Sequence, residues 1–262
     1  GQSTIPKCVK LHFEITKNLN IEWGGVEQTI VKFMTLFNLV QSKFANEGIT
    51  VRLSYLKIWN TDDPYYQSWV GSPGLVGSYQ DLGMQSFQNL GGTINGNIGI
   101  LLNTFSSKFL GLAGGIPCSN QGFNVNRIYP NFDSENVKTI MHEIGHTLGS
   151  NHTHWCGWIG GAIDNCSPTE GGCPLGPAPV NGGTIMSYCG SPNIVNNGFG
   201  PQPNAIIVNT VANSSCITSC DSSLSCEDNI VNAGTINNTS PTSFTVGWTS
   251  SYAVKVYFKE VG

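Results

Sequence analysis

The stretch "DSENVKTIMHEIGHTLGSNH" (residues 133–152) predicts a helix that ends in a sharp turn and carries three histidines and one glutamate. Asp133 or Ser134 is a suitable N-cap, and Gly149 suits a left-handed turn just past the helix. Apolar residues recur on one stripe that should face the core: Val137, Ile140, Met141, Ile144 and Leu148. We therefore expect a buried helix with its chemically active side chains near the C-terminal end.

The spacing of the histidines predicts a zinc site. His142 and His146 are four residues apart, so their side chains leave the same face of the helix, as two ligands of one tetrahedral zinc ion require. Gly149 lets the chain turn sharply, so that His152 can return as a third ligand. Glu143 lies beside the first ligand, where it can reach a water on the metal without binding the metal itself.

A pair of histidines four residues apart is common on helix surfaces, but the added glutamate, glycine and third histidine at their fixed offsets favour a metal site over a chance match. A closed structural site would need a fourth protein ligand. His154 is the nearest histidine left, and two residues beyond His152 it should point elsewhere. His12 lies in a predicted strand, where we expect it to face solvent. We therefore predict an open, catalytic site with three protein ligands.

The rest of the chain predicts an α/β (α+β) fold. Alternating apolar residues in "CVKLHFEIT" (8–16) and "VRLSYLKIW" (51–59) indicate strands, and "GVEQTIVKFMTLFNLVQSKFANEG" (25–48) between them indicates a helix ended by Gly48. This order predicts a largely parallel sheet. "NIGILLN" (97–103) should add a strand, residues 82–90 a helical segment, and "SKFLGLAGGIPC" (107–118) an edge strand.

The amino-acid composition limits which classes of partner the protein can bind and indicates where it is located. Charged residues are only 11% of the 262, the net charge is −4, and no basic run or apolar stretch of membrane-spanning length occurs. We therefore expect no nucleic-acid partner and no membrane span. Nine cysteines favour disulfides and a secreted, extracellular protein. The start "GQSTIPKCVK" has no secretory leader pattern, so we expect any leader or propeptide to have been removed.

Cysteines recur in the poorly patterned segment that follows the zinc helix. Cys156, Cys166, Cys173 and Cys189 can form two bridges there, and a loop of this length is unusual without such bridges. An odd total of cysteines leaves one thiol free or without its partner.

"HEIGHTLGSNH" (142–152) resembles the HExxHxxGxxH signature of the metzincin clan of zinc endopeptidases. "GGTIMSYCG" (182–190) is similar to the clan's methionine turn, which implies that Met186 packs beneath the zinc without binding it. "YLKIWNTDD" (55–63) and "NGNIGILLNTF" (95–105) resemble segments of the adamalysin (reprolysin-like) branch, particularly its secreted bacterial members. The likeness spans roughly residues 9–216.

The resemblance implies a fold and a reaction. The fold would have a twisted, mostly parallel sheet with an antiparallel edge strand, a long active-site helix and an irregular, disulfide-stapled lower subdomain. Glu143 would act as general base and acid in zinc-dependent hydrolysis of peptide bonds. An extended polypeptide substrate would pair with the edge strand around Gly111, Leu112 and Ala113. A monomer with one catalytic Zn²⁺ is expected, and Cys216 or Cys220 is a candidate partner for Cys118.

Two residues near the site allow more than one interpretation. Adamalysins usually have an aspartate directly after the third histidine, and that aspartate anchors part of the fold; here the residue is Thr153, which also resembles the pappalysin branch. Tyr188 resembles the tyrosine that astacins and serralysins place on or near zinc, where it would assist catalysis by stabilising the oxyanion. It would otherwise be an ordinary packed turn residue.

The domain limits follow from composition. We expect a catalytic domain over 1–218, with an upper subdomain over 1–149 and a lower one over 150–218. "NAIIVNTVANSSC" (204–216) should form its last helix. Residues 219–262 are β-rich, and they resemble the start of a fibronectin type III-like domain, too short for a whole one.

Two other functions and one other metal remain open. The chain could be a catalytically silent or latent binding or adhesion module on a metalloprotease fold, although an intact Glu143 argues against this. It could also be a zinc hydrolase acting on a non-peptide amide. Ca²⁺ binding is possible through Asp62, Asp63 and Asp164, but no EF-hand spacing occurs and solvated turn acids are the simpler interpretation.

Overall fold

A computed structural model gives the architecture of the chain. The structure describes residues 7–65, 94–104, 110–119, 122–131, 133–179, 181–191 and 193–220. The predicted helical segment at 82–90 and the fibronectin-like residues from 221 onward lie outside these ranges. No helix in the described part of the chain is both long and apolar enough to cross a membrane.

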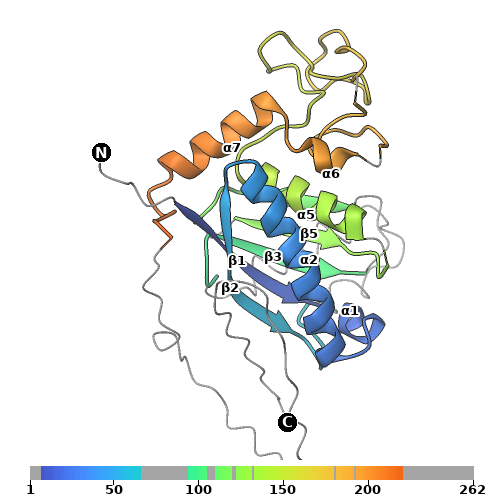
Figure 1. Ribbon diagram of the computed structural model, residues 1–262, viewed down its shortest axis with the longest axis vertical. Coiled ribbons are helices and arrows are strands. Elements are labelled where there is room, and N and C mark those ends of the chain that lie inside the picture. Colours follow the sequence, from blue (N-terminus) through green and yellow to red (C-terminus); the bar gives the residue numbers. More distant parts are fainter. Residues whose placement is uncertain are drawn as a thin grey trace, which may run out of the picture.

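A five-stranded sheet forms the centre of the described structure, with strand order β2-β1-β3-β5-β4 (Figure 1). The strands are β1 (Cys8–Ile15), β2 (Thr50–Ile58), β3 (Ile98–Asn103), β4 (Gly111–Gly114) and β5 (Phe123–Arg127). Four of them pair in parallel, whereas β4 pairs antiparallel with β5 at one edge. The predicted mostly parallel α/β sheet with an antiparallel edge strand is therefore confirmed.

The two long helices α2 and α5 pack side by side against the sheet, and α7 lies beyond their ends (Figure 1). The helices are α1 (Lys17–Glu22), α2 (Val26–Asn46), α5 (Asp133–Thr147), α6 (Ile194–Asn197) and α7 (Pro201–Asn213). α2 ends before Gly48, whose φ of 76° fits the predicted stop. Asp133 and Ser134 are the first and second residues of α5, so neither is its N-cap.

Aromatic and aliphatic side chains fill the space between α2 and β1. Phe13 packs edge-on against Phe33 and Phe37, with ring centroids 5.0 Å and 5.8 Å away. All three side chains are buried, so the apolar stripe of α2 faces the core as its periodicity predicts.

The opposite face of β1 is also covered, so the prediction that His12 faces solvent was wrong. His12 is only 6% exposed, and its Nε2 lies 3.4 Å from Glu14 Oε1. Trp59 and Tyr65 donate hydrogen bonds to Glu14 Oε2 at 2.7 Å and 2.9 Å. The residues that follow β2 therefore cover the face of β1 that the alternation of apolar and polar residues predicted to be exposed to solvent.

Four disulfides join cysteines of the described residues: Cys8–Cys220, Cys118–Cys216, Cys156–Cys173 and Cys166–Cys189. Two of them lie within the segment that follows α5, as predicted. Cys118 bonds to Cys216, one of the two predicted candidates. The ninth cysteine, Cys226, lies outside the described residues. The segment that follows α5 is therefore cross-linked, and its described residues between Ser150 and Ser191 form little regular structure.

Candidate metal centre and active site

Helix α5 carries the first part of the site. Its apolar stripe is fully buried, and this fixes the rotation of the helix about its axis: Val137, Ile140, Met141, Ile144 and Leu148. With that face against the core, His142 and His146 project together one turn apart. Their ring centroids are 4.6 Å apart.

The turn after α5 brings in the third histidine. Gly149 has a φ of 93°, which a side chain would strain, and the chain reverses there. His152 then lies with its Nε2 3.0 Å from Nε2 of His146, while Nε2 of His142 lies 3.1 Å from the same atom. The structure thus brings together the three predicted ligands, and these residues could hold a metal ion.

The other ring nitrogen of each histidine has an acceptor. Nδ1 lies 2.7 Å from Ile185 O in His142, 2.8 Å from Ser150 O in His146 and 2.8 Å from Glu170 Oε1 in His152. Carbonyl and carboxylate oxygens only accept, so each Nδ1 carries the proton. Three Nε2 lone pairs then face one another, an arrangement that suits Zn²⁺ and is otherwise unfavourable.

The surroundings keep these imidazoles neutral, as metal ligands must be. Burial lowers the pKa of His142 well below its ordinary value, with a further contribution from His146. Burial and the neighbouring His152 lower the pKa of His146 to about 4. Burial also lowers the pKa of His152, although its hydrogen bond to Glu170 opposes this.

Glu143 lies beside the histidines without joining their cluster. It is 5% exposed, and burial raises its pKa to about 8. Its carboxylate lies against the edge strand: a β-carbon on Gly111 would collide with Oε1, Cγ and Cδ of Glu143. A divalent cation nearby would lower this pKa again, because an opposite charge favours the ionised carboxylate.

Met186 is fully buried beneath α5. A β-carbon on Gly145 would lie 2.8 Å from Met186 Sδ and 2.9 Å from Phe199 Cε1, so the helix can approach this turn only through a glycine. Thr153 N and Oγ1 both donate to Met186 O, at 3.1 Å and 3.3 Å. The segment with the third histidine is therefore tied directly to the methionine turn.

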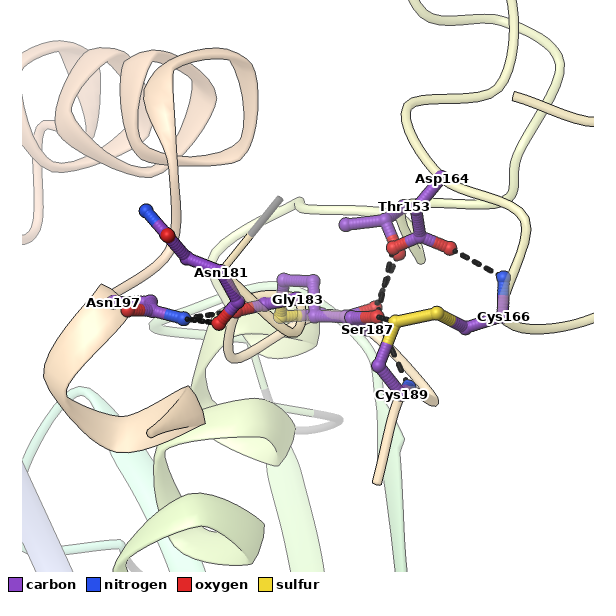
Figure 2. The surroundings of a disulfide bond; sticks show 9 residues. Thr153, Asp164, Cys166, Asn181, Gly183, Ser187, Cys189 and Asn197 are labelled. Carbon is purple, nitrogen blue, oxygen red and sulfur yellow. Dashed lines mark hydrogen bonds between the residues drawn. A yellow bond between two sulfur atoms is a disulfide. The ribbon is translucent and has the colours of Figure 1, made fainter. Parts of the chain in front are cut away.

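A buried aspartate extends this connection (Figure 2). Ser187 Oγ donates to Asp164 Oδ2 at 2.7 Å, and Cys166 N donates to Asp164 Oδ1 at 3.1 Å. The Cys166–Cys189 disulfide joins the same two segments. Asp164 is thus engaged within the protein.

The candidate calcium residues do not gather. Asp63 accepts hydrogen bonds from the backbone of Lys17 and Tyr65, and Asp62 pairs with Lys17 Nζ at 2.8 Å. In the described part of the chain, the groups that could hold a metal include neither of these aspartates. Asp164 joins such a group only with two disulfide-bonded cysteines. The described residues therefore give no support for a calcium site at these aspartates.

Tyr188 lies at the rim of the histidine cluster. Its hydroxyl is 3.0 Å from Nε2 of His152, and the side chain is 53% exposed. Partial burial raises its pKa, and the charges of Glu143 and Glu170 add to the effect. The phenol is therefore protonated at neutral pH and can donate a hydrogen bond.

Sequence reasoning missed Glu170. Its Oε1 accepts from both His152 Nδ1 and His154 Nε2, at 2.8 Å and 3.2 Å. Burial alone would raise the pKa of Glu170, but these two histidines outweigh it and lower the pKa. His154 Nε2 contacts Glu170, and His154 does not belong to the group formed by His142, His146 and His152. Glu170 belongs to no spacing motif with the histidines. The sequence marks it only by its position between Cys166 and Cys173, two cysteines predicted to form disulfides.

Comparison with known proteins agrees with this geometry. A reprolysin-type family model, described as Metallo-peptidase family M12, matches residues 6–197. A search of curated proteins gave no match. Among solved structures, a chain in "Structure of a chaperone-substrate complex" is similar at 14% identity with a TM-score of 0.40. The match covers 56% of this chain and 24% of that one, a likeness too weak to bear on the fold. The family match, which spans most of the chain, shows that this protein belongs to metallopeptidase family M12.

Proposed function

We propose that this protein is a secreted zinc endopeptidase of the metzincin type, with His142, His146 and His152 as zinc ligands and Glu143 as general base and acid. The observation that carries the proposal is the convergence of three Nε2 lone pairs beside a buried carboxylate. Bound Zn²⁺ would supply a Lewis acid that polarises the scissile carbonyl and makes water a better nucleophile.

Glu143 is suited to moving the proton. Burial makes its carboxylate more basic than an exposed glutamate, so it can accept a proton from the attacking water. The same oxygen can then pass that proton to the leaving amine. Tyr188, whose hydroxyl faces the cluster, would donate a hydrogen bond to the oxyanion as negative charge develops there.

Strand β4 supports an extended peptide as substrate. It is the last strand of the described sheet, and only its inner side pairs with β5. A peptide pairing with the outer side at Gly111, Leu112 and Ala113 would run past the Glu143 carboxylate, because Gly111 contacts that group. This contact favours peptide over a non-peptide amide.

The four disulfides favour a secreted protein, since such bonds persist in oxidising compartments. The adamalysin-like assignment within the family is also part of the proposal. Thr153 departs from the pattern of that branch. Asp164, however, accepts a hydrogen bond from Ser187 and so provides a buried carboxylate contact to the methionine turn. The alternative, a silent adhesion module, is disfavoured because three convergent histidines and a buried Glu143 are all present.

Digestion of a denatured protein and a peptide library tests the proposal. The purified chain should cleave internal peptide bonds, lose this activity with a zinc chelator and regain it when Zn²⁺ is restored. Wild-type protein that binds one zinc but cuts no peptide would contradict the endopeptidase and favour the adhesion module. Cleavage that persists after complete removal of metal would contradict the zinc mechanism.

A further inference from the structure

The three histidines differ in what orients them. His142 and His146 direct Nδ1 to backbone carbonyls, whereas His152 directs Nδ1 to the side chain of Glu170 at 2.8 Å. Glu170 is therefore the one acceptor of the three that carries a charge and can be changed by substitution. A carboxylate on the second nitrogen fixes the tautomer of a metal-binding imidazole and raises its basicity.

Backbone contacts hold Glu170 in place. Its N–H donates to His154 O at 3.0 Å, and its carbonyl accepts from Cys156 N at 2.8 Å. Trp155 and Glu170 form a bridge between the two segments, and the Cys156–Cys173 disulfide closes the loop around it. Glu170 is thus held on two chain segments that hydrogen bonds and the Cys156–Cys173 disulfide join.

His154 contacts the same carboxylate as His152. Its ring stacks on that of His152 at a centroid distance of 4.9 Å and an interplanar angle of 10°. Its Nε2 lies 3.2 Å from the same Oε1 that His152 contacts. The side chain of His154 is buried, so Glu170 is held by a second, fixed donor and cannot turn away freely.

From this geometry we infer that Glu170 is a positioning residue for the third metal ligand: it holds His152 as the Nδ1–H tautomer with the Nε2 lone pair facing His142 and His146, and so strengthens Zn²⁺ binding. The inference rests on the proposed zinc site. It assigns a role to a residue of the irregular loop far from the zinc helix in sequence.

The test compares Glu170→Ala and Glu170→Gln with the wild type and with Thr169→Val. Thr169 Oγ1 donates to Cys173 O at 2.8 Å, so Thr169→Val removes a hydrogen bond from the same loop without touching a histidine. Zinc affinity is measured by competition with a chelating indicator. The His152 tautomer in the zinc-free protein is read from ¹⁵N chemical shifts, and the Co²⁺-substituted proteins are compared by absorption spectra.

We expect Glu170→Ala to weaken zinc binding by about 10- to 100-fold, as loss of such partners does elsewhere. His152 of that variant should lose its Nδ1–H preference, and its Co²⁺ spectrum should change. Glu170→Gln should be intermediate, because the amide oxygen still accepts but carries no charge. Thr169→Val should keep wild-type zinc affinity.

Two results would overturn the inference. One is a zinc affinity of Glu170→Ala within about twofold of the wild type; the other is an equal loss in Thr169→Val, which would mean a general effect of the loop. Zinc affinity, the His152 tautomer and the Co²⁺ spectrum can all be measured without peptide cleavage. A wild type that binds zinc but cuts no peptide would therefore refute the proposed function and leave this inference standing.

Discussion

The carboxylate of Glu143 and the backbone of Gly111 lie in direct contact, so that a β-carbon on Gly111 would overlap Glu143 Oε1. Gly111 belongs to the edge strand and Glu143 to the helix with the histidines. This contact joins the proposed base to the strand on which the peptide would lie.

Gly111→Ala should therefore reduce peptidase activity while leaving zinc bound. The Glu143 side chain can rotate, so we expect the base to move and the fold to persist. The loss in kcat/KM should be at least about tenfold, or about 1.4 kcal/mol in transition-state stabilisation. Gly190→Ala is the matched control, because Gly190 has nothing within 4 Å of an added β-carbon. Full activity in Gly111→Ala would contradict the assigned contact.

Tyr188→Phe separates the two interpretations of this tyrosine. If the hydroxyl stabilises the oxyanion, kcat should fall by about 10²–10³-fold, as for loss of other oxyanion donors. Zinc content and KM should change little, since the ring remains. Steady-state kinetics and metal analysis measure both quantities. An unchanged kcat would make Tyr188 a packed turn residue.

Asp164→Ala should destabilise the disulfide-linked segment that follows α5. It would remove the buried carboxylate that accepts hydrogen bonds from the Ser187 hydroxyl and the Cys166 N–H, at a cost of about 1–3 kcal/mol. Asp62→Ala is the control: Asp62 is exposed and makes only a surface ion pair with Lys17, worth about 0–1 kcal/mol. Urea unfolding of the zinc-free proteins gives both values. Equal losses would contradict the role of the buried network.

Glu14 should make the fold sensitive to acid. Burial alone would raise its pKa, but the hydrogen bond from His12, the charge of Lys57 and the hydrogen bond from Trp59 outweigh it, so the pKa is lowered. A carboxylate with a lowered pKa in the folded state stabilises the fold above its unfolded pKa of about 4.3, and this stabilisation is lost as pH falls through the folded value.

The free energy of unfolding of wild type should therefore exceed that of Glu14→Gln at neutral pH, and the gap should narrow below pH of about 4. Denaturant unfolding of the two proteins across this range measures the gap. A gap that stays constant or widens in acid would show that the charge of Glu14 does not stabilise the fold.

The local features of the chain were predictable from sequence. The stripe of α5, the offsets of His142, His146 and His152, and the turn at Gly149 all follow from helix geometry. The parallel sheet followed from strand, helix and strand in succession, and the edge strand from its glycines.

Features that depend on distant segments were not predictable. The alternation of apolar and polar residues in β1 predicted that His12 faces solvent. That prediction was wrong because nothing in the strand reveals that Trp59 and Tyr65 cover its second face. Glu170 reaches His152 only because a loop without periodicity is closed by Cys156–Cys173. Which cysteines pair is likewise a property of the folded chain.

In the proposed mechanism, Glu143 transfers protons beside a metal held by three histidines. The most direct test of this mechanism is the turnover and zinc content of Glu143→Gln against wild type, with Glu135→Gln, an exposed glutamate on the same helix, as control. We expect one zinc per chain in all three proteins and a loss of about 10²–10⁴-fold in kcat for Glu143→Gln alone. A Glu143→Gln variant that binds zinc and cleaves peptide at the wild-type rate would contradict this mechanism.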